Sequence, residues 1–299
     1  MGNILIIGSG PAGISAALYA KRGGADVTVF TKGAGALAKA ERIENYYGLP
    51  GPVSGAELER NGIAGAERLG VQFVRGEVVD LGMDDTWSHF VVATADASYT
   101  GDSVILAAGA SRVVPSLPGL AELEGHGVSY CAVCDAAFYK NKVTGVLGNG
   151  AYALHEAEVL RPHAAKVILL TDGRGMTVPV PPEFAVRTDK LAELKSTTEN
   201  GRTRIRGVRL ENGEELVLDG LFVALGTAGS TELARKMGAR VEAGHIKVDS
   251  HMATNVPGLF AAGDCTGGLL QVVKAACEGA EAGLSALRYV RDKEKRAKA

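Results

Sequence analysis

Two closely spaced cysteines have the most readable chemistry in this chain. They lie in the segment Cys131-Ala132-Val133-Cys134-Asp135 of a 299-residue sequence that holds four cysteines. Thiols with two residues between them can cycle between a dithiol and a disulfide. The same spacing forms half of many zinc sites, but the sequence has neither a second Cys-x-x-Cys nor a pair of histidines to complete one. The pair therefore predicts redox chemistry, and we predict no metal site.

The residues around the pair suit that chemistry. A short helix is predicted from Asp135 to Tyr139, directly after the second cysteine. A thiol at the start of a helix has a lowered pKa, because the helix dipole favours the thiolate. Asp135 could relay a proton during the reaction. The remaining cysteines, Cys265 and Cys277, are isolated among small apolar residues, so we predict that both are buried, unreactive thiols.

Two glycine-rich motifs flank the pair, Gly8-Ser9-Gly10-Pro11-Ala12-Gly13 and Gly148-Asn149-Gly150-Ala151-Tyr152-Ala153. Each follows an apolar run and precedes a helical pattern, which is the setting of a dinucleotide-binding turn. Its glycines let the backbone approach a pyrophosphate, whose charge the helix N-terminus favours. The acid expected after the next strand, to bond a ribose hydroxyl, is absent, and Thr31-Lys32 stand there. We therefore expect the adenosine end of a nucleotide to be held differently.

Gly263-Asp264 ends an apolar run late in the chain. A carboxylate there could bond the ribityl hydroxyls of a flavin, or the aspartate could cap a following helix. Taken with the first glycine motif, cofactor binding is favoured. The cysteine pair, the glycine motifs and this aspartate together predict an enzyme that passes electrons through a flavin to a disulfide.

The elements that must position these residues form a repeated pattern of strand, glycine turn, helix and strand, which opens a doubly wound parallel sheet. The predicted strands are residues 3–7, 26–31, 142–147 and 166–170, and the predicted helices include residues 14–20 and 154–160. Capping-box spacing at Ser54 to Glu57 predicts a helix that runs to about Leu69. Glu211-Asn212-Gly213 predicts a hairpin turn between β segments at 203–210 and 214–218.

After residue 245 the chain returns to features that suit the first unit, such as the segment Gly258 to Asp264. The predicted fold class is therefore α/β, with two Rossmann-like, three-layer dinucleotide-binding domains. The second domain is inserted into the first and truncated. The predicted boundaries place residues 1–112 and 244–299 in the FAD-binding domain and residues 113–243 in the inserted domain that carries the cysteine pair.

Composition sets limits on the partners. A content of 46% hydrophobic and 22% charged residues is that of a globular protein, and a formal charge of −2 gives no general attraction to nucleic acid or anionic membranes. The apolar run at 3–7 is too short to cross a membrane. We predict a cytoplasmic protein without nucleic-acid or membrane partners, and we expect the basic stretch 291–298 to be a frayed terminus.

Over its whole length the chain resembles the low-molecular-weight flavoprotein thioredoxin reductases. The shared residues are Gly8–Gly13, Glu44-Asn45, Ala108-Gly109-Ala110, Cys131–Asp135, Gly148–Ala153, Gly258–Asp264 and Gln271-Val272. This resemblance implies bound FAD, thioredoxin as a partner and a homodimer. It also implies that Cys134 faces the flavin, that Cys131 attacks thioredoxin and that Asp135 is the acid/base. The related dithiol oxidases usually carry Cys-x-x-Cys-His, and Asp135 argues against that branch.

The resemblance also implies the residues that hold FAD. Asn45 and the backbone of Gln271 and Val272 would lie nearest the isoalloxazine ring. The other implied contacts are Gly8, Ser9, Gly10, Pro11, Ala12, Gly13, Gly35, Ala36, Leu37, Val78, Ala108, Gly109, Gly263 and Asp264.

The resemblance fails in the second domain. Members that use NADPH carry a His-Arg-Arg cluster after the strand equivalent to 166–170, and then a helix with another arginine. Here Thr171-Asp172-Gly173 replace the cluster, and the following segment Arg174 to Pro182 cannot be helical through its prolines. A carboxylate at Asp172 would repel a 2′-phosphate, and the lost helix removes one wall of the adenosine pocket.

Two electron donors fit this difference. Asp172 lies about 24 residues beyond Gly148, near the position where an acid binds the ribose of NAD, and this favours NADH. Alternatively the second site is vestigial and a protein supplies the electrons. The proline-rich segment and the stretch from Gly35-Ala36-Leu37 to residues 41–48 resemble the pyridine-nucleotide-independent, ferredoxin-linked branch. We favour ferredoxin, because Asp172 restores one contact whereas the missing helix removes many; NADH ranks second and NADPH third.

A flavin-binding redox sensor that signals through its cysteine pair is the non-enzymatic alternative. The sequence shows neither an appended effector domain nor a DNA-binding helix pair that would support it. Turnover with thioredoxin would separate a reductase from a sensor.

Overall fold

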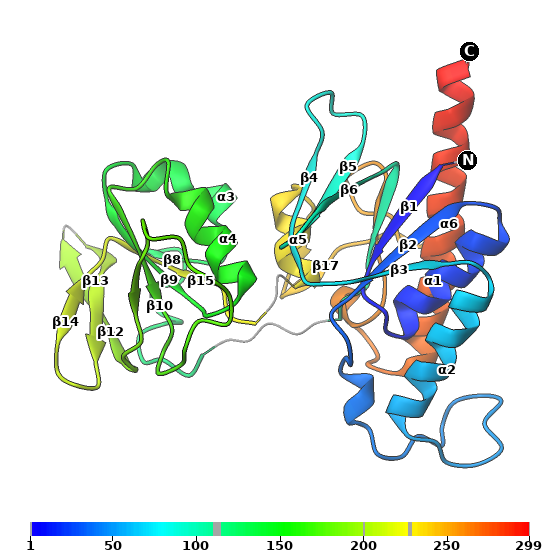
Figure 1. Ribbon diagram of the computed structural model, residues 1–299, viewed down its shortest axis with the longest axis horizontal. Helices are drawn as coiled ribbons and strands as arrows, with labels where there is room; N and C mark the ends of the chain where they lie inside the picture. Colours follow the sequence, from blue (N-terminus) through cyan, green and yellow to red (C-terminus); the bar gives the residue numbers. More distant parts are fainter. Residues whose placement is uncertain (1, 110–114, 200, 227–228, 299) are drawn as a thin grey trace. The chain divides into compact units, whose positions relative to one another are not determined.

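A computed structural model describes residues 2–109, 115–199, 201–226 and 229–298 (Figure 1). Its contacts divide the chain into unit 1, Met1–Ser111 with Gly229–Ala299, and unit 2, Arg112–Ala228. The predicted boundary after residue 112 lies outside the described residues. The predicted return to unit 1 at residue 244 is too late, since the contacts return at Gly229. The reason is helix α5, Ser230–Lys236, which packs against strand β4, Val78–Met83, of unit 1.

Unit 1 is built on a five-stranded parallel sheet of order β18-β7-β1-β2-β3. The strands are β1 Asn3–Ile7, β2 Asp26–Thr31, β3 Gln72–Arg75, β7 Ser103–Leu106 and β18 Leu259–Ala261. Buried apolar runs at β1 and β7 suit central strands covered on both faces. Strand β18 comes from the C-terminal part of the chain, so unit 1 needs both of its segments.

Helices and a second sheet cover the two faces of this parallel sheet. Helices α1, Pro11–Arg22, α2, Gly55–Arg68, and α6, Val272–Lys298, belong to the helical layer. Helices α1 and α6 approach so closely that a Cβ built at Gly279 would lie 2.1 Å from the Ala12 carbonyl oxygen. On the other face, the rings of Tyr99 and Phe30 pack edge to face, with their centroids 5.0 Å apart. Tyr99 belongs to an antiparallel sheet of β4, β5, Phe90–Thr94, and β6, Ser98–Gly101.

The helix predicted from Ser54 shows how the local sequence specifies an element. Ser54 precedes α2, and its hydroxyl accepts a hydrogen bond from Glu57 N at 3.1 Å, as the capping-box spacing predicts. The strands predicted at 3–7 and 26–31 are likewise present as β1 and β2. A two-stranded ribbon, β16 Val241–Glu242 and β17 His245–Ile246, completes the described elements of unit 1 beside its 3-10 turns.

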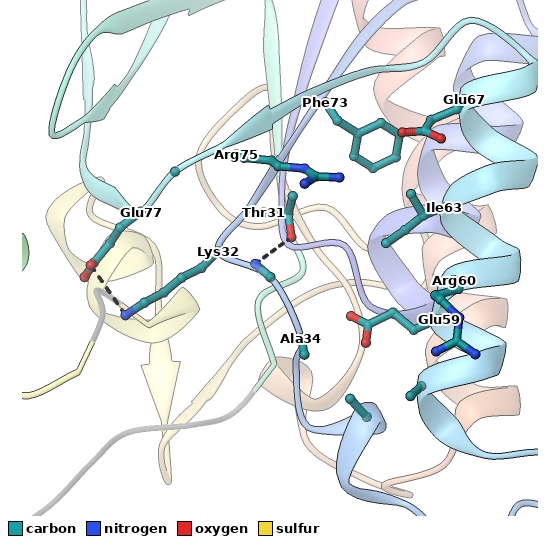
Figure 2. A pocket seen from close by; sticks show the side chains of 14 residues that line it. Thr31, Lys32, Ala34, Glu59, Arg60, Ile63, Glu67, Phe73, Arg75 and Glu77 are labelled. Carbon is teal, nitrogen blue, oxygen red and sulfur yellow. Dashed lines mark hydrogen bonds and ion pairs between the residues drawn. The ribbon is translucent and has the colours of Figure 1, made fainter.

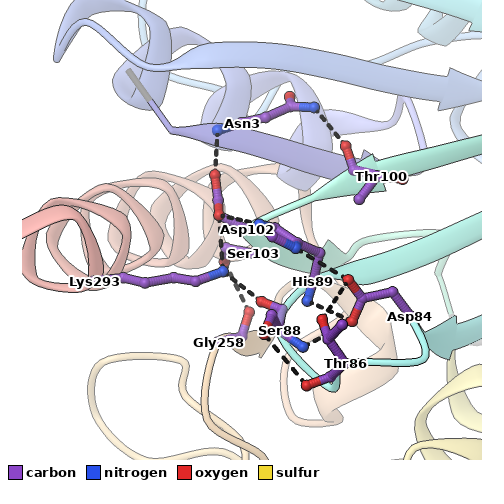
Figure 3. Close-up of polar contacts among 10 residues, drawn as sticks. All are labelled: Asn3, Asp84, Thr86, Ser88, His89, Thr100, Asp102, Ser103, Gly258 and Lys293. Atoms are coloured by element: carbon purple, nitrogen blue, oxygen red, sulfur yellow. Dashed lines mark hydrogen bonds and ion pairs between the residues drawn. The ribbon is translucent and has the colours of Figure 1, made fainter. Parts of the chain in front are cut away.

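The C-terminal end of α6 contradicts the expectation of a frayed terminus. The helix continues to Lys298, and Lys293 Nζ lies 2.8 Å from Asp102 Oδ1 (Figure 3). Asp102 also accepts a hydrogen bond from Asn3 N at 3.0 Å, and His89 Nε2 lies 3.6 Å from it. His89 in turn contacts Asp84 at 3.1 Å. These contacts hold α6 against the rest of unit 1 at Lys293, whereas Lys295 and Arg296 beyond it are exposed.

Unit 2 repeats the plan with a parallel sheet of order β11-β10-β9-β15-β8. Its strands are β8 Val128–Ser129, β9 Val143–Leu147, β10 Lys166–Leu170, β11 Ala185–Arg187 and β15 Gly220–Val223. Helix α4, Ala151–Leu160, packs against β9 and β10. An antiparallel sheet of β12 Leu191–Glu199, β13 Arg202–Leu210 and β14 Glu215–Val217 supplies the other layer.

Both units therefore confirm the predicted α/β class with parallel sheets. The predicted truncation of the second unit is visible between β10 and β11. Residues 171–184 form turns and bends in place of a helix, as their prolines require. The hairpin turn at Glu211-Asn212-Gly213 joins β13 to β14, and Gly213 has a φ of 89°, which glycine adopts without strain.

Candidate functional site

The predicted redox pair forms a disulfide between Cys131 and Cys134, with Cα atoms 5.3 Å apart. Both residues belong to the start of a short helix, α3, Ala132–Asp135, which continues as a 3-10 turn, η2, Ala136–Tyr139. The helix therefore begins before Asp135, where the sequence had placed its start. Cys131 is the N-cap residue, and its Sγ accepts a hydrogen bond from Cys134 N at 3.2 Å.

The two sulfur-bearing residues differ in exposure. Cys131 is buried, whereas Cys134 and the neighbouring Val133 are exposed. Asp135 is half-buried at the end of α3. Burial raises the pKa of Tyr139, and the negative charges of Asp135 and Asp219 raise that pKa further. The pair therefore has one accessible position and one position protected by the fold.

Two residues that the sequence analysis did not single out hold the backbone of the pair. Ser129 Oγ accepts a hydrogen bond from Cys131 N at 3.1 Å. Glu156, on α4, accepts one from Ala132 N at 2.7 Å. Glu156 lies on the same helix face as the buried residues Tyr152, Ala153, Ala157 and Leu160. A glutamate on an otherwise apolar face is the signal that could have indicated it.

The first glycine motif forms the turn between β1 and α1 that its spacing predicts. Gly8 has a φ of 117°, and a Cβ built there would lie 2.3 Å from the Ala107 carbonyl oxygen. A Cβ on Gly13 would lie 1.9 Å from the Gly8 carbonyl oxygen, whereas at Gly10 it would meet no atom within 4 Å. Pro11 occupies the first turn of α1. The turn thus leaves open space beside Gly10 at a helix N-terminus, which suits a pyrophosphate.

A cavity of about 630 Å³ opens beside the ends of β2 and β3 and the side of α2 (Figure 2). Its lining includes Lys32, Arg60, Phe73, Arg75 and Glu77. Lys32 Nζ lies 3.4 Å from Glu77 Oε2. Glu77 Oε1 is buried without a hydrogen-bond partner among the described residues. Burial raises the pKa of Glu77, and the charge of Lys32 partly offsets this rise.

This cavity lies beside the end of β2, where the acid expected to bond a ribose is absent. Thr31 uses its hydroxyl internally, at 2.7 Å from Ser9 Oγ and 3.1 Å from Gly33 N. Glu59, Glu67 and Glu77 line the cavity, and only Glu77 has a buried carboxylate oxygen without a hydrogen-bond partner among the described residues. Glu77 directly precedes Val78, a predicted FAD contact. The predicted contacts Gly35, Ala36 and Leu37 connect Ala34 and Ala38, both of which line the cavity. The structure therefore gathers these residues around a space suited to an adenosine group.

The predicted contacts of the flavin end also gather in unit 1. Asn45 Nδ2 donates to Gln271 Oε1 at 2.9 Å, although 226 positions separate the two residues. Val272 begins α6 directly after Gln271. Ala108 and Gly109 follow β7, and the neighbouring Ala110 lies outside the described residues. Gly8, Ala108 and Gly263 follow β1, β7 and β18, and the carboxyl ends of parallel strands are where such sheets bind ligands.

Asp264 begins a 3-10 turn, η3, Asp264–Thr266, after Gly263. This turn is fixed by two side chains of α6. Glu278 accepts hydrogen bonds from Gly263 N at 2.8 Å and from the Thr266 hydroxyl at 2.9 Å. Lys274 Nζ lies 3.0 Å from Glu278 and donates to the Gly263 carbonyl at 2.8 Å. Sequence reasoning missed both, although their spacing of four residues is that of an ion pair on one helix face.

The other cysteines behave differently from each other. Cys265 is fully buried, and burial raises the pKa of its thiol to about 12. Cys277 is exposed, so the prediction that it is buried is wrong. It lies on α6, two residues after buried Ala275, on the solvent side of the helix. The small residues around it in the sequence do not show which side of the helix it occupies.

The second glycine motif lies between β9 and α4, and its own chain covers part of it. Thr177 donates to the Asn149 carbonyl oxygen through N at 2.8 Å and through its hydroxyl at 3.0 Å. Asn149 Nδ2 donates to the Gly175 carbonyl oxygen at 3.0 Å. Asp172, at the end of β10, accepts a hydrogen bond from Leu191 N at 2.9 Å. The segment that replaces the missing helix is thus attached to the turn itself.

Within the described parts of the chain, no helix is long and apolar enough to span a membrane. In the same residues, no group of three or more His, Cys, Asp or Glu side chains is arranged to hold a metal ion.

Comparison with known proteins decides the family. Residues 2–280 match the family model described as pyridine nucleotide-disulphide oxidoreductase. The chain belongs to this family. A thioredoxin reductase of Aquifex aeolicus (strain VF5) is 35% identical to it over 98% of this chain and 94% of that protein.

Among solved structures, the atypical thioredoxin reductase TRi from Desulfovibrio vulgaris Hildenborough has a TM-score of 0.90 and 36% identity, and covers 98% of this chain and 99% of that one. A ferredoxin-flavin thioredoxin reductase from Clostridium acetobutylicum has a TM-score of 0.70 and 32% identity, and covers 97% of this chain and 98% of that one. This pyridine nucleotide-disulphide oxidoreductase is therefore of the thioredoxin reductase type, as its sequence motifs indicate.

The cofactor of the family fits unit 1. Members of the thioredoxin reductase type are FAD-binding flavoproteins, which confirms the predicted cofactor. The structure offers the open turn at Gly10, the cavity with the unpartnered Glu77 oxygen, and the joined side chains of Asn45 and Gln271. The described residues thus supply positions for a pyrophosphate, an adenosine and a flavin ring within one unit.

Proposed function

We propose that this protein is a flavin-dependent thioredoxin-disulfide reductase that receives its electrons from reduced ferredoxin. The observation that carries the reductase activity is the Cys131–Cys134 disulfide at the start of α3, in a chain that also provides a complete FAD fold. Two features of unit 2, the segment after β10 and its contacts with the second glycine turn, support the choice of donor.

We take the roles of the two cysteines from the resemblance to thioredoxin reductases. FAD, when bound, supplies two electrons. Cleavage of the Sγ–Sγ bond by two electrons and one proton leaves a thiolate at Cys131 and a thiol at Cys134, and Asp135 would relay that proton. Cys134 N stabilises the Cys131 thiolate, because the same N–H already donates to Cys131 Sγ. That thiolate attacks one sulfur of the thioredoxin disulfide and displaces the other. Cys134 then attacks Cys131 Sγ of the mixed disulfide, which releases reduced thioredoxin and restores the pair.

Serine variants test these roles. Cys134→Ser is expected to leave flavin reduction by the donor intact, to stop turnover and to trap a mixed disulfide between Cys131 and thioredoxin. Cys131→Ser is expected to keep a thiolate near the flavin, visible as a long-wavelength charge-transfer band. Cys265→Ser is the control and should turn over normally. If Cys265→Ser stops turnover while Cys134→Ser does not, the assignment of the pair is wrong.

The first feature that bears on the donor is the segment after β10. Asp172 stands where members that use NADPH carry basic residues, and residues 173–182 form no helix. The second is the attachment of Thr177 and Gly175 to Asn149 in the glycine turn. Each charge-assisted contact to a phosphate contributes about 1.5–3 kcal/mol, so the loss of several lowers affinity for NADPH by orders of magnitude.

An iron–sulfur protein has no need of such a pocket. It passes single electrons, which a flavin can accept one at a time and deliver in pairs. A protein that is similar over 97% of this chain, from Clostridium acetobutylicum, is a ferredoxin-flavin thioredoxin reductase, and this supports the same donor here.

NADH is the second candidate, on one specific observation. Asp172 follows β10 at the position where an acid binds the ribose of NAD. Against it, Asp172 Oδ1 already accepts a hydrogen bond from Leu191 N. We therefore place NADH behind ferredoxin.

Anaerobic stopped-flow mixing of the oxidised protein with each donor tests the choice. We expect rapid flavin bleaching by reduced ferredoxin and negligible bleaching by NADPH at millimolar concentration. Saturable bleaching by micromolar NADH would make Asp172 a nucleotide ligand and rule out the ferredoxin assignment. Saturable bleaching by NADPH would contradict both.

We also propose, from the resemblance to thioredoxin reductases, that the protein works as a homodimer in the cytoplasm. Sedimentation of the purified flavoprotein measures the oligomer, and a monomer at micromolar concentration would count against it.

A further inference from the structure

Glu156 is a charged side chain inside unit 2 that the proposed reaction does not use. It lies on α4, and only 1% of its surface is exposed. Burying a carboxylate costs free energy unless hydrogen bonds compensate for the lost water. Glu156 Oε2 accepts a hydrogen bond from Ala132 N at 2.7 Å, and this contact is itself buried. Ala132 is bonded through its nitrogen to Cys131, so the carboxylate meets the backbone between the two cysteines.

The first backbone N–H groups of a helix have no partner within the helix and need one from elsewhere. In α3 three of them are satisfied by three different groups. Cys131 N donates to Ser129 Oγ at 3.1 Å, Ala132 N to Glu156, and Cys134 N to Cys131 Sγ at 3.2 Å. The third partner is the Cys131 sulfur, which is itself part of the redox pair. Ser129 and Glu156 are therefore the two partners that come from outside the pair.

Helix α4 contacts this segment at two points one turn apart. Tyr152, which is 2% exposed, donates from its hydroxyl to the Tyr130 carbonyl oxygen at 3.4 Å. Glu156 follows Tyr152 by four residues and so lies on the same helix face. Together they fasten the strand end before Cys131 and the first turn after it to one rigid helix.

We propose that Glu156 is a positioning residue for the redox pair: its carboxylate holds the first turn of α3 so that Cys131 and Cys134 close into a disulfide. The inference deepens the proposed function, because it assumes that this pair carries the electrons. Oxidation of the dithiol removes two electrons and two protons and forms the Sγ–Sγ bond. Without the anchor, the reduced turn samples more conformations and the two sulfurs meet less often.

Two variants separate reach from charge. Glu156→Gln keeps the length of the side chain and an oxygen that accepts from Ala132 N, but removes the charge. Glu156→Asp keeps the charge but is one methylene shorter, so it cannot reach. Glu156→Ala removes both. Glu158→Ala is the control, because Glu158 is an exposed glutamate on the same helix.

The measurement is the equilibrium of Cys131 and Cys134 with glutathione redox buffers in the intact flavoprotein, with the fraction of disulfide determined by mass spectrometry. We expect Glu156→Asp and Glu156→Ala to lower the equilibrium constant for disulfide formation by about tenfold, because the two thiols have a lower effective concentration when the reduced turn samples more conformations. Glu156→Gln is expected to stay within about threefold of the parent, and Glu158→Ala to be unchanged.

The inference is overturned if Glu156→Asp keeps the parent equilibrium constant, or if Glu156→Gln fails to restore it. If Glu156→Ala does not fold, as judged by flavin content and cooperative melting, the Asp and Gln variants still decide the question. This equilibrium involves neither thioredoxin nor an electron donor. If the parent protein does not reduce thioredoxin, the proposed function is refuted. The role of Glu156 is then still decided by the glutathione equilibrium.

Discussion

Single side chains determine which thiols react. Burial raises the pKa of Cys265 to about 12, whereas Cys277 is exposed, and Cys131 and Cys134 are joined in a disulfide. A thiol reacts as its thiolate, so iodoacetamide at pH 8 is expected to label Cys277 in the oxidised native protein and to leave Cys265 unlabelled. Peptide mapping measures this, and denatured protein, in which both are labelled, is the control. Labelling of native Cys265 at a comparable rate would contradict its burial.

Glu77 illustrates a residue that the sequence could not indicate. The missing acid after β2 is visible in the sequence, but Glu77, whose buried oxygen is at the cavity, comes from the β3–β4 connection, which only the fold brings there. Glu156 differs, because its place on an otherwise apolar face of α4 is a signal that the sequence does carry. Motifs with fixed spacing, such as the cysteine pair and Gly8 to Gly13, were readable because their chemistry is local.

Glu77 Oε1, which has no hydrogen-bond partner in the described parts of the chain, is a candidate contact for the cofactor. We expect it to accept a hydrogen bond from the adenosine part of FAD, so Glu77→Ala, which removes the acceptor, should weaken FAD binding by about tenfold. Fluorescence titration of the apoprotein with FAD measures the Kd. Glu67→Ala is the matched control, since Glu67 lines the same cavity but is exposed. Equal Kd values for the parent and Glu77→Ala, or equal effects of both substitutions, would refute this role.

Among the elements, the C-terminal end of helix α6 differs from the sequence prediction, because it is helical and not frayed. Its basic C-terminal residues indicated a frayed end, because composition cannot show a partner as distant in sequence as Asp102. In the structure Lys293 Nζ lies 2.8 Å from Asp102 Oδ1. Burial raises the pKa of Asp102, but the hydrogen bonds from Lys293 and Asn3 N lower it by more, so the net pKa is lowered. By contrast, α2 was predicted from its own cap, a local signal at Ser54.

Lys293→Met, which keeps the apolar part of the side chain, is expected to lower the free energy of unfolding by about 1 kcal/mol at pH 7. A carboxyl whose pKa is lowered by folding stabilises the protein above its unfolded pKa of about 4, and this contribution is lost as the pH falls through the lower folded pKa. The difference between parent and variant should therefore shrink below about pH 4. Chemical denaturation measures it. Lys295→Met, at an exposed position of the same helix, should change stability by less than about 0.5 kcal/mol.

For the molecule as a whole, the sequence predicted the class of fold and the insertion, because the repeated strand–turn–helix pattern can be read along the chain. The sequence does not predict where the inserted unit ends. Unit 1 resumes at Gly229 because α5 packs against β4, and no sequence motif marks that contact. Ala108 N donates to Ser230 Oγ at 3.0 Å, so the two parts of unit 1 meet where the inserted unit leaves and returns.

That contact allows unit 1 to be tested for completeness. Strand β18 pairs with β7, and α6 packs on α1, so a chain that stops after residue 228 lacks an edge strand and a main helix of the FAD-binding fold. We expect such a truncated chain to be colourless and unfolded. A chain in which a short Gly/Ser linker replaces residues 112–228 should retain FAD, because Ala108 and Ser230 near the two junctions are already in contact and a short loop costs little entropy to close. Flavin absorbance per mole of purified protein and circular dichroism measure both variants. A yellow, folded product from the truncated chain, or a linker variant that cannot be reconstituted with FAD, would show that unit 1 is not the independent cofactor-binding unit that its contacts indicate.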